Sequence, residues 1–282
     1  MSAYLERFDF TLGRDLVLVT VGFTAYLLSF RIFGGVNEII ADCPRYTWWN
    51  AFTYQLFIFP LFCFLSYKEI SETYPNASFI DKMLVYWPEG PRENSWPMSR
   101  MWLLCFFGYM TKDMVGVYKI GPMYYLHHFV CIYLALTFLL LDVTPFIMIV
   151  GGTVAETGSA CINGHSFGFA TGKPWLRYLF LFIMTCSNLF VIWELVPFNR
   201  AIPSTGPTCA TFWLTIVVNL LCVERERQAL MKMMVKETFV PGAKGKPDKV
   251  IQGEPIDIPI VFSLIGATAG YFTVTQLALL NK

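Results

Sequence analysis

The stretch WWNAFTYQLFIFPLFCFLSY, Trp48–Tyr67, contains no charged residue. A bilayer core about 30 Å thick is crossed by roughly 20 apolar residues in a helix. Backbone polar groups find no water in hydrocarbon, so such a stretch must satisfy its own hydrogen bonds, which a helix does. The sequence therefore predicts a transmembrane helix here.

Comparable apolar blocks lie on both sides of this stretch, separated by short segments that hold most of the charged residues. These further blocks are Leu16–Phe33, Met101–Tyr118, Met123–Leu141, Val143–Asn163, Trp175–Val196, Thr208–Val223 and Ile258–Leu280. We therefore predict an all-α fold, a polytopic membrane bundle of about seven or eight transmembrane helices. Almost nothing joins Met123–Leu141 to Val143–Asn163, so these two are expected to pack as antiparallel neighbours.

The composition agrees with a membrane protein. Hydrophobic residues make up 55% of the chain and charged residues only 15%, whereas a soluble protein carries about 25% charged residues. The net charge of +1 gives no electrostatic reason to bind nucleic acid. The eight cysteines form no CxxC pair, so we interpret them as small buried apolar residues. We therefore expect neither a bound metal nor a cofactor.

Two polar segments interrupt the apolar pattern. Lys68–Arg100 is rich in proline and tryptophan, which favours an irregular loop at the membrane interface. Glu224–Glu254 has the densest basic charge, beginning as a charged helical extension and continuing as a Gly/Pro-rich linker. Cytoplasmic segments are enriched in Lys and Arg, so we expect Glu224–Glu254 on the cytoplasmic side. The glycosylation sequon at Asn76 then falls on the opposite side.

Four polar residues within the apolar blocks are the candidate site: Asp113, His127, His128 and Glu156. Charges inside membrane spans are rare, and they usually face the bundle interior with a partner. His127 shares a helix face with Cys131, and His128 lies beside Tyr124.

Glu156 shares its face with Gly152, Thr153 and Ser159, small residues that would let the fourth and fifth blocks, Met123–Leu141 and Val143–Asn163, approach closely. A His pair facing Glu156 could act as a general acid/base couple, with the carboxylate fixing the imidazole tautomer. The alternative is a polar cluster that only specifies how the helices pack.

At these residues the chain resembles the TLC-domain family, which includes ceramide synthases, translocating-chain-associated membrane proteins and several regulators of membrane lipids. The resemblance is carried by GYMTKD (Gly108–Asp113), LHHFV (Leu126–Val130) and AETGS (Ala155–Ser159), in that order, with Trp49, Asn50 and Asn219 at similar positions. It covers about Trp48–Met231.

The apolar blocks and the extent of the resemblance together divide the chain into four segments. Residues 1–47 form an N-terminal transmembrane helix and connector, and 48–231 a TLC-like domain. Residues 232–257 form the basic linker, and 258–282 an extra C-terminal transmembrane helix. Ceramide synthases carry an Asp-x-x-Asp pair after the His-His helix, and here Thr153 takes the first acidic position. The chain is thus more similar to the branch without synthase activity.

Three functions follow from the resemblance. The first is a protein that binds or regulates membrane lipids. The second is an acyl-CoA-dependent N-acyltransferase, with acyl-CoA as substrate, His127 or His128 as base, and Glu156 or Asp113 orienting it. The third is a structural subunit that binds membrane-protein partners through the eighth helix and the basic linker. We expect a multi-pass protein of the endoplasmic reticulum or another endomembrane, with an organelle inner membrane as the alternative.

Overall fold

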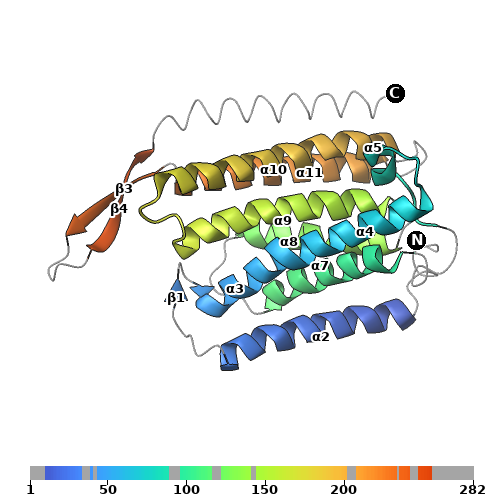
Figure 1. Ribbon diagram of the computed structural model, residues 1–282, viewed down its shortest axis with the longest axis horizontal. Helices are drawn as coiled ribbons and strands as arrows, with labels where there is room; N and C mark the ends of the chain where they lie inside the picture. The colour runs from blue at the N-terminus through green and yellow to red at the C-terminus, as the bar shows by residue number, and fades with distance from the viewer. Residues whose placement is uncertain are drawn as a thin grey trace. The chain divides into compact units, whose positions relative to one another are not determined.

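The computed structural model describes residues 10–33, 39–40, 43–88, 96–115, 122–140, 144–201, 208–233, 235–241 and 247–255. The chain divides into two compact units, one ending at Phe167 and the other beginning at Gly168. Helices dominate both units, as predicted (Figure 1). Each unit is described here by itself.

Five long helical stretches build the first unit. They are α2 (Phe10–Phe33), a continuous stretch from Arg45 to Thr73, α7 (Pro97–Val115), α8 (Pro122–Leu140) and α9 (Pro145–Phe167). A short helix, α5 (Phe79–Met83), and two paired strands, β1 (Ile39–Ile40) and β2 (Cys43–Pro44), complete it. Three of the long helices begin at proline. Proline has no backbone N–H, and the N–H groups of a first helical turn have no partner within the helix, so no hydrogen bond is lost there.

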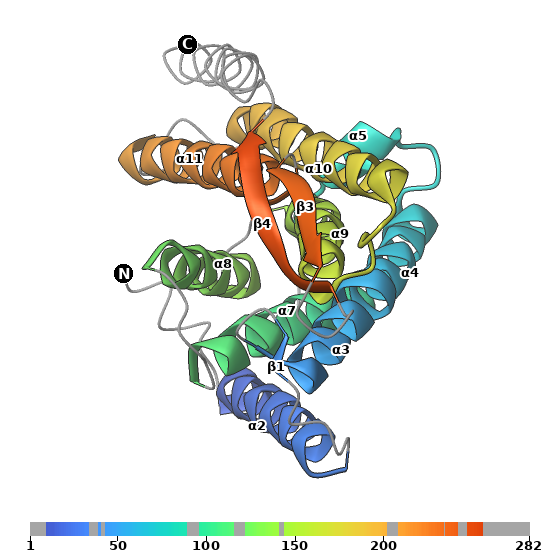
Figure 2. The same cartoon turned by 90° about the vertical axis from the view of Figure 1, so that its left-hand side faces the viewer.

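The central helix of this unit is α7, which packs against α2, α4, α8 and α9 (Figure 2). Trp102 stacks on Phe106 of the same helix at 4.8 Å between ring centroids, and Phe59 lies against both rings. At the start of α7, Glu69 accepts hydrogen bonds from the backbone N–H groups of Met98 and Ser99. These donors have no partner within their own helix, so Glu69 fixes the first turn of α7 against α4.

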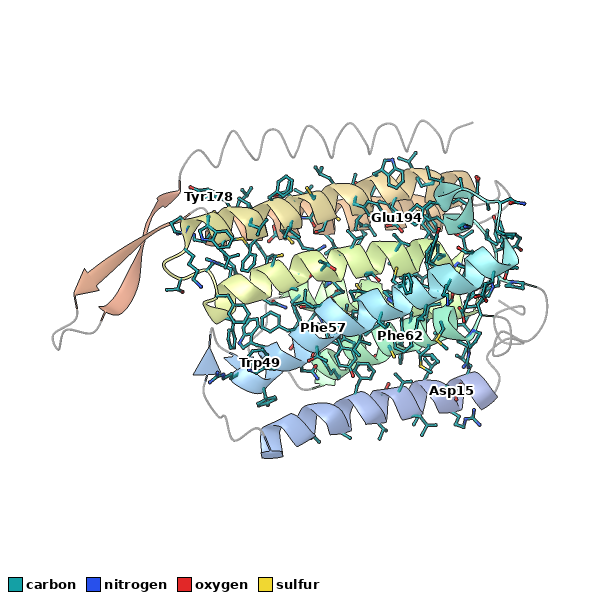
Figure 3. The ribbon with its side chains drawn as sticks, in the orientation of Figure 1. Asp15, Trp49, Phe57, Phe62, Tyr178 and Glu194 are labelled. Carbon is teal, nitrogen blue, oxygen red and sulfur yellow. The ribbon has the colours of Figure 1, made fainter. Side chains whose placement is uncertain are left out.

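The charge-free stretch Trp48–Tyr67 is helical but not uniform. It consists of α3 (Arg45–Thr53), a π-helical segment η1 (Tyr54–Ile58) and α4 (Phe59–Thr73). Pro60 cannot donate to the carbonyl of Leu56, so an ordinary α-helical ladder is interrupted at this point. The wider π-helical turn lies immediately before it. Phe57 and Trp49 are exposed on this stretch, where Figure 3 labels them.

The second unit contains a helix pair, α10 (Pro174–Ala201) and α11 (Thr208–Met233), followed by β3 (Val235–Pro241) and β4 (Pro247–Pro255). The strands form an antiparallel hairpin. The segment read from the sequence as a Gly/Pro-rich linker therefore contains paired strands, and this is a correction. The predicted eighth helix, Ile258–Leu280, lies outside the described residues.

Seven of the predicted apolar blocks coincide with helices in the described part of the chain. Three helices there are long and apolar enough to cross a membrane: Arg45–Thr73, Pro145–Phe167 and Pro174–Phe198. They support a transmembrane protein. The predicted irregular segment Lys68–Arg100 is partly helical, because α4 continues to Thr73 and α5 follows with Ser78 as its capping residue.

Candidate functional site

Three donors converge on the carboxylate of Asp113, near the end of α7. Lys112 donates to Oδ1, and the hydroxyl of Tyr124 donates to Oδ2 over 3.2 Å. Nε2 of His128 lies 3.4 Å from the same Oδ2. Tyr124 and His128 are one turn apart on α8, so they reach the carboxylate from one face of that helix. We call Lys112, Asp113, Tyr124 and His128 the Asp113 cluster.

The hydrogen bonds of His128 determine where its protons lie. Nδ1 is 3.0 Å from the carbonyl oxygen of Tyr124, which can only accept, so Nδ1 carries a hydrogen. Nε2 faces a carboxylate oxygen that also only accepts when it is ionised. Both ring nitrogens of His128 thus face acceptors. The cluster places the carboxylate of Asp113 against the ammonium of Lys112 and the imidazole of His128.

The cluster lies inside the first unit. Lys112 and His128 are buried, and the Lys112 ammonium lies 4.1 Å from the ring centroid of Tyr109. The outward face of α8 is instead apolar and exposed, at Tyr125, Leu126, Phe129 and Tyr133. The inward face carries the polar groups, followed by the buried Cys131, Ala135 and Phe138.

Glu156 belongs to a second polar group. Its Oε2 accepts a hydrogen bond of 2.8 Å from the amide of Gln55, whose own Oε1 accepts one of 3.0 Å from Asn163. Gln55 is in the π-helical segment η1. Gln55 and Glu156 are buried, and the bond between Asn163 and Gln55 is partly buried. This line of polar side chains links two of the helices that could cross a membrane.

For His128, the predicted partnership with Glu156 needs a correction. The carboxylate bonded to His128 is that of Asp113, at the contact between α7 and α8. The carboxylate of Glu156 accepts a hydrogen bond from Gln55. His127 has Cys131 beside it, with the sulfur 3.8 Å from both ring nitrogens.

Gly152 and Thr153, on the same face as Glu156, contact a different helix from the one predicted. A Cβ added at Gly152 would lie 2.4 Å from the ring of Trp102, so the helix that approaches closely is α7. Thr153 accepts a 3.1 Å hydrogen bond from the indole N–H of the same tryptophan. Thr153 therefore has a packing role.

Sequence reasoning did not assign Lys112, Tyr124, Gln55 or Asn163 to the site. The sequence could have indicated two of them. Lys112 is a charged residue within an apolar block, and Tyr124 lies four residues before His128, on the same helix face. Gln55 and Asn163 are uncharged and far apart in the chain, so only the packing of the helices brings them together.

A further buried polar group lies in the second unit. The carboxylate of Glu226 accepts hydrogen bonds from Thr185 and from the amide nitrogen of Asn188, at 2.5 and 2.7 Å. Both donors are within the candidate span of α10. The charged extension of α11 thus lies alongside the middle of an apolar helix, which the sequence did not predict.

Comparison with protein-family models, with curated proteins and with solved structures finds no match to this chain. Within the described residues, no three His, Cys, Asp or Glu side chains are grouped so as to hold a metal ion.

Proposed function

We propose that this chain is a TLC-like integral membrane protein that binds or regulates membrane lipids, with the Asp113 cluster as the site for a lipid headgroup. One observation carries the proposal. A charged cluster is buried between α7 and α8, while the other face of α8 exposes only large apolar and aromatic side chains.

The physical argument starts from the desolvation of charge. Removing an ionised group from water costs several kcal/mol even after the surroundings relax, and pairing offsets this loss only when the geometry is good. The bond between His128 and Asp113 is long, at 3.4 Å, so part of the capacity of this imidazole for hydrogen bonding is unused. A polar headgroup would supply the missing partner, and the acyl chains would lie along the apolar face of α8.

Lipids that purify with the protein provide the test. We expect the wild-type chain, extracted in mild detergent, to retain one lipid class well above its share of the membrane. Lys112→Met keeps the length of the side chain and removes its charge, so it should reduce the retained class about tenfold or more, as the loss of a buried charged hydrogen bond implies. Mass spectrometry of the extracted lipids measures both.

Arg227→Met is the matched control, because the ion pair of Arg227 with Glu224 is on the surface. This variant should retain lipid like the wild type, and both variants should elute as folded protein. Wild-type protein with the lipid composition of the bulk membrane, or Lys112→Met with an unchanged lipid, would contradict the proposal.

A second candidate is the acyl-CoA-dependent N-acyltransferase, favoured by the contact between His128 and Asp113. A base held by a carboxylate is what removal of a proton from an amine requires. We predict no detectable acyl transfer from acyl-CoA to a sphingoid base by purified protein, because Thr153 brings no second carboxylate. N-acylation that disappears in His128→Ala would reverse this ranking.

The topology belongs to the same proposal. We propose seven or eight membrane spans in an endomembrane, with the basic segment after Met233 on the cytoplasmic side. That segment and the last apolar block, Ile258–Leu280, would also be available to a membrane-protein partner. Protease digestion of sealed vesicles tests the orientation: cleavage within 235–255 from the cytoplasmic side is expected, and protection there would reverse the assignment.

A further inference from the structure

A buried amide lies unpaired in α3, in the same unit as the Asp113 cluster. Asn50 has 0% of its surface exposed, and among the described residues neither its amide nitrogen nor its amide oxygen has a hydrogen-bond partner. A buried amide without partners has given up its hydrogen bonds to water and gained none in exchange, which is unfavourable. Such a group indicates a partner that binds from outside the chain.

The packing of α7 against the Arg45–Thr73 helix gives the level of this amide. Glu69 bonds to the first turn of α7, Phe59 lies against Phe106, and Tyr54 lies 5.5 Å from Tyr109 between ring centroids. Residue numbers fall along one helix as they rise along the other, so the two helices run antiparallel.

The same register extends one turn further. Asn50 precedes Tyr54 by one helical turn and shares its face, while Lys112 and Asp113 follow Tyr109 by one turn. Tyr54 faces Tyr109, and continuing this antiparallel register by one turn puts Asn50 at the level of Lys112 and Asp113.

We propose that Asn50 is part of the lipid site and that the lipid it recognises presents a free hydroxyl group. The unpaired oxygen of the amide requires a donor, and the unpaired nitrogen requires an acceptor. A hydroxyl supplies both from one atom, whereas an ionised phosphate or carboxylate supplies acceptors only. This inference rests on the proposed lipid-binding function, and it adds the chemical class of the ligand.

The hydroxyl could belong to a glycerolipid or to a sterol, and two arms of one experiment separate these sources. The purified full-length chain is placed in micelles containing diacylglycerol, or the same diacylglycerol methylated on its hydroxyl. The second arm uses cholesterol and its methyl ether. The temperature of unfolding is measured in each.

We expect one hydroxyl lipid to raise the unfolding temperature of the wild type by about 3 °C or more, with no rise for its methyl ether. The ether cannot donate to the oxygen of Asn50, and its methyl group occupies the space of the hydrogen. The arm in which the difference occurs identifies the source.

Asn50→Leu provides the matched variant, since leucine has a similar shape and no polar atoms. It should abolish the difference between alcohol and ether. Without added lipid it should be at least as stable as the wild type, because it removes an unpaired amide. Thr53→Val is the control, because the Thr53 hydroxyl bonds to the carbonyl of Trp49 in its own helix, and it should keep the difference.

Equal effects of alcohol and ether in both arms on the wild type would overturn the inference, and this comparison requires no variant. A difference that persists in Asn50→Leu would also overturn it. If lipid retention still depends on Lys112 in either case, the proposed function stands while the hydroxyl preference fails. If no lipid is retained, both fail.

Discussion

At the scale of single residues, the contact between His128 and Asp113 joins α8 to α7. Asp113 and His128 were both predicted as site residues, and they do meet. The predicted role of Glu156 as the partner of the imidazole was wrong for His128. Helical spacing relates residues on one helix, but it does not say which neighbouring helix faces them, so a sequence cannot choose between two carboxylates on different helices.

Gly152 provides a prediction at this scale. Gly152→Ala should lower the free energy of unfolding by about 1–3 kcal/mol, because the added methyl group would overlap the ring of Trp102, which is fully buried. Unfolding in detergent, followed by intrinsic fluorescence, measures the change.

Gly22→Ala is the control for the same chemical change. A Cβ at Gly22 of α2 meets no atom within 4 Å, so alanine there should leave stability unchanged or raise it by up to about 1 kcal/mol. If both substitutions had the same effect, the close approach of α7 to α9 at Gly152 would be wrong.

At the scale of the helices and strands, apolar blocks predicted where helices form, because the length of a charge-poor run is a local property. Their ends were less predictable. Charged residues extend α2 beyond its apolar block, since a helix continues wherever its backbone hydrogen bonds can. The charged extension of α11 was predicted, and the helix continues to Met233. The β3–β4 hairpin was missed because glycine and proline favour turns and linkers alike.

The contact of α2 with α7 gives a prediction about pH. Asp15, labelled in Figure 3, bonds to Arg100 over 2.7 Å. Burial acts to raise the pKa of Asp15, but the hydrogen bonds and charges of Arg100 and Arg14 outweigh it and lower this pKa below its usual 3.8. The unfolded chain therefore takes up this proton first. The stabilisation by Asp15 is complete above pH 3.8 and is lost as pH falls below that value.

We expect Asp15→Asn to be less stable than the wild type at neutral pH, and the difference should shrink as the pH falls below 3.8. Unfolding temperatures of both proteins across this acidic range measure the effect. A difference that stays constant with pH would show that the carboxylate charge does not hold α2 to α7.

At the scale of the whole molecule, membrane character could be predicted from composition alone, and three helices support it. The grouping of helices could not. The division after Phe167 and the pairing of Glu226 with Thr185 and Asn188 depend on contacts between residues distant in sequence. Glu226 follows the seventh apolar block, so the sequence placed it outside the membrane. In the structure it lies beside the middle of the apolar helix α10.

The central claim is that a lipid headgroup binds at the Asp113 cluster, and photo-crosslinking tests it most directly. The probe is a lipid of the class that purifies with the protein, carrying a diazirine beside its headgroup. After irradiation, the modified residues are mapped by mass spectrometry. We predict modification within Tyr109–Cys131, competed by the natural lipid and absent in Lys112→Met. Modification confined to the exposed face of α8, or unchanged in Lys112→Met, would contradict the claim.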